Sequence, residues 1–91
     1  MYKPKIERGR HDGIQKIYSF DNGYGASVIK HSFSYGGNVG LWELAVIKFA
    51  NKDNYTDYKI DYVTPITNDV IGFLNEKEVE KKLKEIKNLK I

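Results

Sequence analysis

Hydrophobic residues concentrate in one run near the middle of the chain, residues 40–49 (GLWELAVIKF). Apolar side chains fall on both faces that a strand would have there, with a glycine-rich stretch before the run and Asn51 to Asn54 after it. A short apolar run with aromatic and β-branched residues and flanking turn formers is typical of a strand buried on both faces. We therefore take residues 40–49 as the central strand of a sheet.

Three further stretches have the pattern of strands. Residues 14–20 and 24–33 flank Asn22-Gly23, and an Asn-Gly pair between two such stretches predicts a hairpin with a type I′ turn. Residues 55–63 alternate between a charged side and a largely apolar side, which is typical of a half-buried antiparallel strand. With residues 40–49, these stretches predict a four-stranded antiparallel meander.

The C-terminal part has the pattern of helices. Residues 67–69 (TND) are suited to cap a short helical turn over 70–74. Asn75 is suited to cap a longer helix, and Glu78 would complete a capping box. The apolar residues of this longer helix form one narrow stripe: Val79, Leu83, Ile86 and Leu89. A single stripe predicts that the helix packs on one face of the sheet.

The predicted fold class is therefore α+β, with a four-stranded antiparallel meander sheet and a C-terminal helix packed on one face. We assign this single domain to residues 14–91. Residues 1–13 contain Pro4, Gly9 and Gly13 and show no helical or strand periodicity, so we expect a flexible basic arm there.

Composition narrows the class of protein. A chain of 91 residues provides one modest core, and the absence of cysteine excludes disulfides and thiolate metal sites. The sequence has no apolar run of the roughly 18 residues that a membrane span needs, and Met1 to Lys5 lead into no signal-peptide region. We expect a cytoplasmic protein with no membrane partner.

The net charge of +3 is concentrated at the two ends of the chain. This distribution argues against one uniformly basic face for nucleic acid. It leaves open a small nucleic-acid-binding regulator that uses the arm and the lysine-rich helix. The residues that would carry this alternative function are Lys3, Lys5, Arg8, Arg10, Lys81, Lys84 and Lys87.

Catalytic and metal-binding patterns are fragmentary. His31 and Glu43 would be an acid–base pair if adjacent strands brought them together, but a single histidine in a strand pattern is more often a surface or packing residue. Asp57 and Asp61 would lie about 13 Å apart along a strand, which is too far to bind one ion. We therefore predict no enzyme, no cofactor and no metal site.

Aromatic residues are frequent, with seven tyrosines, four phenylalanines and one tryptophan. Residues 34–40 combine an aromatic residue with three glycines, as in loops that carry binding contacts, although the glycines could serve turn geometry alone. Core packing, nucleic-acid stacking and protein contacts all use such aromatics, and the scarcity of arginine near the sheet favours a protein partner. The predicted partner-binding residues are Tyr24, Tyr35, Gly36, Gly37, Asn38 and Trp42.

Four segments resemble a family of small uncharacterised proteins of tailed bacteriophages: residues 24–29 (YGASVI), 34–37 (SYGG), 40–46 (GLWELAV) and 64–74 (TPITNDVIGFL). The resemblance spans about residues 14–90 and leaves out residues 1–13. It implies a phage origin and a host cytoplasm as the setting, and it implies no assigned activity.

These observations lead to one functional expectation. We expect a non-catalytic phage accessory protein that binds a host protein, such as an inhibitor of a host defence nuclease complex (anti-CRISPR-like). The alternative is the nucleic-acid-binding regulator described above. A homodimer formed through an edge strand, 14–20 or 55–63, or through an exposed sheet face stays open as well.

Overall fold

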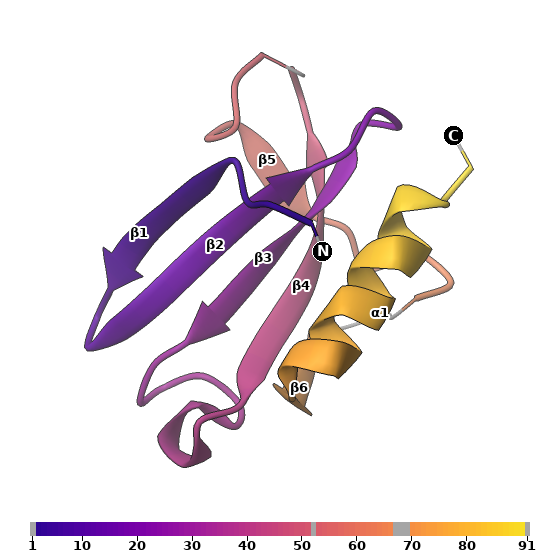
Figure 1. The fold of residues 1–91 in the computed structure, drawn as a ribbon. Helices are drawn as coiled ribbons and strands as arrows, with labels where there is room; N and C mark the ends of the chain where they lie inside the picture. The colour runs from indigo at the N-terminus through magenta and orange to yellow at the C-terminus, as the bar shows by residue number, and fades with distance from the viewer. Residues whose placement is uncertain (1, 52, 67–69, 91) are drawn as a thin grey trace.

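The computed structural model describes residues 2–51, 53–66 and 70–90. Their elements are β1 (Ile6–Arg10), β2 (Gly13–Ser19), β3 (Tyr24–Lys30), the 3₁₀ turn η1 (Gly37–Val39), β4 (Trp42–Phe49), β5 (Tyr58–Ile60), β6 (Ile71–Leu74) and α1 (Glu76–Lys87). The sheet is antiparallel in the order β1-β2-β3-β4-β5, with β6 also paired to β4 (Figure 1). The predicted α+β class is confirmed, but the described sheet has six strands and not four.

Strand β1 lies within the stretch predicted to be a flexible arm, and it corrects that expectation for residues 6–10. It pairs with β2 along its whole length, from Ile6 opposite Ile17 to Arg10 opposite Gly13. Four of its five residues are exposed, so the apolar alternation that reveals a strand is missing from its sequence. Strand β1 is therefore ordered by its pairing with β2, which its own composition does not indicate.

The predicted hairpin between β2 and β3 is confirmed, but its turn is not type I′. Phe20 N donates to Tyr24 O at 2.9 Å, and of the Asn-Gly pair only Gly23 has a positive φ, 86°. These features describe a three-residue loop. The Asn22 side chain lies against the end of α1, where its Nδ2 donates to three carbonyl oxygens: Ile86 (2.9 Å), Lys87 (3.1 Å) and Leu89 (3.0 Å).

Strand β4 is paired along both edges. One edge holds β3, while the other holds β6 beside Trp42 and Leu44 and then β5 beside residues 47–49. Strand β5 covers only three residues of the predicted 55–63. The predicted helical turn over 70–74 is wrong, because residues 71–74 use the free edge of β4 as a strand; its proposed caps, residues 67–69, lie outside the described residues.

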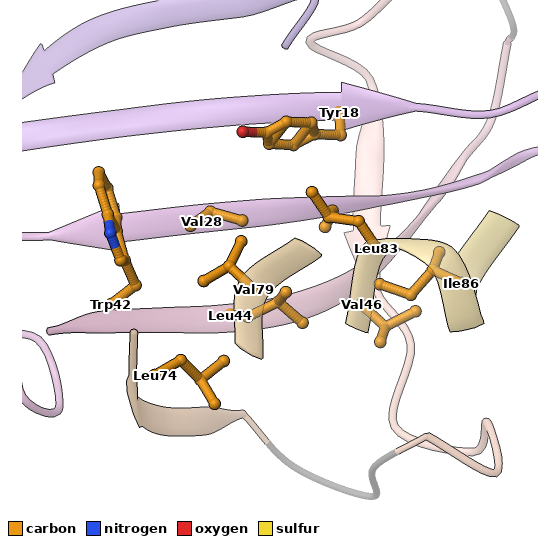
Figure 2. Packing of buried hydrophobic residues seen from close by; sticks show 10 residues of the cluster. Tyr18, Val28, Trp42, Leu44, Val46, Leu74, Val79, Leu83 and Ile86 are labelled. Carbon is orange, nitrogen blue, oxygen red and sulfur yellow. The ribbon is translucent and has the colours of Figure 1, made fainter. Parts of the chain in front are cut away.

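Helix α1 packs on one face of the sheet by its predicted stripe. Figure 2 shows Val79, Leu83 and Ile86 facing side chains of β3 and β4, all of them in one buried cluster. The predicted capping box is confirmed, since Asn75 Oδ1 accepts from Glu78 N (2.8 Å) and Glu78 Oε1 accepts from Asn75 N (3.0 Å). The sequence therefore specifies both the start of α1 and the side that it buries.

The opposite face of the sheet has a smaller cluster of its own. Ile17 and Ile47 are fully buried there together with Phe49, although α1 lies on the other side. Ile6 of β1 packs against this cluster, as do Tyr55 and Tyr58. Strand β1 thus helps to cover the second face of the central strands.

Candidate functional site

The segment between β3 and β4, residues 31–41, is fixed by hydrogen bonds within itself. Ser34 is buried, and its Oγ accepts from His31 N (3.0 Å) and donates to His31 O (2.8 Å). Gly37 N then donates to Ser34 O at 3.1 Å, and two further backbone bonds close the 3₁₀ turn. The loop therefore has a defined backbone, while Phe33, Tyr35 and Val39 are exposed.

Two glycines of this loop have backbone roles. Gly36 has a φ of 91° and lies against the backbone of Phe73, where a β-carbon would come within 2.9 Å of Phe73 Cα. A β-carbon on Gly37 would lie 1.8 Å from His31 O. The structure supports the turn-geometry interpretation for both positions, and Asn38 between them and β4 is exposed.

Four large apolar side chains are exposed on this loop and on the strand beside it. Their exposed fractions are 79% for Phe33, 61% for Tyr35, 64% for Val39 and 60% for Phe73. Strand β6 joins the loop through Phe73 N, which donates to Tyr35 O (3.1 Å) at the end of the molecule below α1 in Figure 1. We call these four residues, which belong to the loop and to the strand bonded to it, the apolar patch; large apolar side chains exposed on neighbouring segments are candidates for an interaction site.

Phe73 occupies a backbone conformation that is unusual for its residue type. Gly72 and Phe73 together lie opposite Glu43, so β6 bulges, and Phe73 takes a φ of 57°. A β-carbon in the left-handed region costs about 1–2 kcal/mol, which is why a bulge residue of this kind is usually glycine. The chain nevertheless has a bulky aromatic residue here, with its ring mostly in solvent.

His31 and Glu43 anchor the backbone of two patch residues. His31 Nδ1 accepts from Phe33 N (3.1 Å), and Glu43 Oε1 accepts from Tyr35 N (2.9 Å). The His31 ring also lies 4.8 Å from that of His11, which in turn contacts Phe33 at 5.6 Å between ring centroids. These contacts orient the loop and provide no bond between His31 and Glu43 within the described residues.

The other predicted partner-binding residues divide into two groups. Tyr35, Gly36, Gly37 and Asn38 lie together in the loop. Trp42 is only 7% exposed, with the ammonium groups of Lys16 and Lys30 at 5.0 and 4.4 Å from its ring centroid. Tyr24 is half-buried beneath Lys48, at 5.3 Å. Both rings are therefore covered by lysines in this structure.

Sequence reasoning missed three of the four patch residues. The predicted strand 24–33 ends at Phe33, and the sequence pattern assigns Val39 only to a glycine-rich connection. An apolar residue among turn formers was the one available signal for these two. Phe73 had no such signal, because its exposure follows from the pairing of β6 with β4.

A cavity of about 350 Å³ lies between the N-terminal residues, the sheet and α1. Glu80 borders it, with Oε1 accepting from Tyr2 N (3.2 Å) and Oε2 buried without a hydrogen bond to any described residue. The Tyr18 hydroxyl points along the sheet toward Trp42 in the same region (Figure 2). Burial raises the pKa of the Tyr18 phenol, and the carboxylates of Glu80 and Glu7 raise it further.

The basic residues of the nucleic-acid alternative lie on two sides of the molecule. Lys81, Lys84 and Lys87 are exposed on α1. Arg8 and Arg10 bond to Gln15, whose side chain lies on the sheet face away from α1. Lys3 and Lys5 are exposed on the segment that leads into β1. Lys3 borders α1 in the cavity described above, whereas Arg8 and Arg10 lie on the opposite face of the sheet, so the predicted basic residues are divided between the two faces.

No protein-family model, curated protein or solved structure matches this chain. The interpretation of its surfaces thus depends on their geometry. Within the described ranges, α1 is too short and too polar to cross a membrane, and no three His, Asp or Glu side chains gather where they could hold a metal ion.

Proposed function

We propose that this protein is a non-catalytic binding module whose apolar patch contacts another protein. The observation that carries this proposal is Phe73, a large aromatic residue kept in solvent at a backbone position that favours glycine. A glycine there would relieve the backbone strain that the β-carbon of phenylalanine imposes. A binding role gives a reason for the exposed ring.

The construction of the loop supports the same proposal. Phe33 and Tyr35 have their backbone N–H groups held by His31 and Glu43, and the turn that follows is closed by its own hydrogen bonds. A surface with a fixed backbone loses less conformational entropy when it binds. Aromatic residues on such a surface are the residue types that most often dominate protein interfaces.

The charge around the patch favours a protein over a single-stranded nucleic acid. Residues 31–41 and 71–75 contain neither lysine nor arginine. Stacking surfaces for nucleic acid combine aromatic rings with a positively charged groove that follows the phosphates. Lys30 borders the loop beside Gly37 and Asn38, but the segments that carry the patch have no positive charge of their own, which suits an apolar protein surface.

The bacteriophage resemblance supplies the setting of this proposal. In that setting the partner is a protein of the bacterial host, and a defence nuclease complex is a suitable target for a small inhibitor without chemistry of its own. The cytoplasm of the host would be the site of action.

Affinity purification from host lysate, followed by binding measurements with the purified partner, tests the proposal. Tyr35→Ala and Phe33→Ala should each weaken binding by about 10-fold or more if these residues are interface anchors. Tyr62→Ala is the matched control, because Tyr62 is 50% exposed, lies two residues after β5 and is outside the patch. Equal affinities for all three variants, or the absence of any specific partner, would overturn the proposal.

A further inference from the structure

Two arginines of β1 share one buried acceptor. Gln15 is 2% exposed, and its Oε1 accepts from Arg8 Nε (2.9 Å) and from Arg10 Nη1 (3.2 Å). The Gln15 Nε2 donates in turn to Ser27 Oγ (2.8 Å) on β3. The amide therefore cannot rotate freely, and it holds both guanidinium groups in a defined place at the sheet edge.

This arrangement brings two positive charges close together without a negative one. Since both donors reach the same oxygen, they lie within about 6 Å of each other. Neither arginine forms an ion pair with a described residue. Glu7 lies between them in sequence but belongs to the other sheet face, opposite Lys16. An anion bound here would relieve the mutual repulsion of the two guanidinium groups.

We propose that Arg8 and Arg10, oriented by Gln15, form a binding site for a phosphate group. Each arginine uses one N–H group on Gln15 and keeps its remaining donors for a ligand. A carboxylate has two oxygens and matches one guanidinium fork, whereas a phosphate has enough oxygens to accept bonds from two. Both arginines are exposed, so the ligand reaches them from solvent.

Inorganic phosphate, a nucleotide and a nucleic-acid backbone all present this chemistry. The site includes no residue of the apolar patch and does not depend on the proposed function. Failure of one therefore leaves the other standing.

NMR titration of the full chain with inorganic phosphate, following the arginine Nε–H and Gln15 amide signals, tests the site. We expect saturable shifts of these signals with phosphate and weaker ones with acetate. A parallel titration with a short single-stranded oligonucleotide identifies the source: tighter binding through the same signals assigns the site to a nucleic-acid backbone, and weaker binding assigns it to a small phosphate compound. Either result supports the phosphate site.

Two double variants separate an organised site from general attraction to positive charge. Arg8→Lys with Arg10→Lys keeps both charges and loses the forks, and Gln15→Met with Ser27→Ala keeps both arginines and removes their shared support. Each should weaken phosphate binding by about 10-fold, because charged hydrogen bonds are lost or misplaced. Circular dichroism verifies that both variants are folded.

Lys81→Ala with Lys84→Ala is the control, since it removes two positive charges from α1 and should leave phosphate binding unchanged. The proposal is overturned if phosphate shifts none of the signals, if acetate binds as tightly as phosphate, or if the two test variants bind phosphate as well as the parent.

Discussion

At position 73, a glycine variant should be more stable than an alanine variant, which is the reverse of the usual order in a strand. In a regular strand, glycine is less stable than alanine by roughly 0.5–1 kcal/mol, because it loses more backbone entropy on folding. Phe73 has a φ of 57°, and a residue with a β-carbon is strained there. We expect Phe73→Gly to be more stable than Phe73→Ala by about 1 kcal/mol.

Both substitutions remove the ring of Phe73, and its exposed fraction determines how much stability is lost with it. Phe73 is 60% exposed, so its side chain hides roughly 80 of the about 200 Å² that a phenylalanine can bury, worth about 2 kcal/mol at about 25 cal/mol per Å². Phe73→Ala should therefore lower the free energy of unfolding by about 2 kcal/mol. Phe73→Gly should lower it by about 1 kcal/mol, because relief of strain offsets part of the loss.

Urea denaturation of both variants measures the difference, and Glu7 provides the matched control. Glu7 is exposed in the middle of β1 and has an ordinary negative φ. Glu7→Ala should be more stable than Glu7→Gly by roughly 0.5–1 kcal/mol. Alanine as stable as glycine at position 73 would refute the strained bulge, and with it the main support for the proposed function.

Two further predictions concern α1 and its surroundings. Asn22→Asp keeps the shape of the side chain, but it removes the three bonds to carbonyls at the end of α1 and places a negative charge there. It should lower the free energy of unfolding by about 2 kcal/mol, measured by thermal denaturation. A melting temperature equal to that of the parent would contradict this role of Asn22. Tyr18→Phe tests the raised pKa of Tyr18. The folded state holds the phenol proton of Tyr18 more tightly than the unfolded chain does. The resulting contribution to the free energy of unfolding is therefore complete below about pH 10 and is lost as the pH rises through the raised pKa. The variant should lose less stability than the parent between pH 8 and pH 11 in urea titrations, and equal losses would show that Tyr18 ionises alike in both states.

The parts of the fold that local sequence specifies were predictable. Asn75 and Glu78 identify the start of α1, and the apolar stripe from Val79 to Ile86 identifies the face that it buries. The turn at Asn22-Gly23 was predicted as a hairpin with the wrong geometry, because the Asn22 side chain bonds to a helix more than 60 residues away. Local propensity carries no information about such a partner.

Long-range pairing also explains the remaining differences. Residues 71–74 have capping residues before them and read locally as a helical turn, yet the open edge of β4 beside Trp42 converts them into a strand. Tyr35 was predicted as a binding residue because it stands in a glycine-rich loop. Phe73 joins it only through a backbone bond between β6 and that loop, which the order of residues along the chain does not indicate.

The position of α1 at the end of this domain has a consequence for its synthesis. The ribosome completes the six described strands before the helix that covers Val28, Leu44 and Val46. At about 5–20 residues per second, the 12 residues of α1 take roughly 0.6–2.4 seconds, and until α1 is made the apolar face of the sheet lacks its cover. The same interval leaves Asn22 without its acceptors. Nascent chains of this protein are thus most exposed to aggregation just before α1 appears.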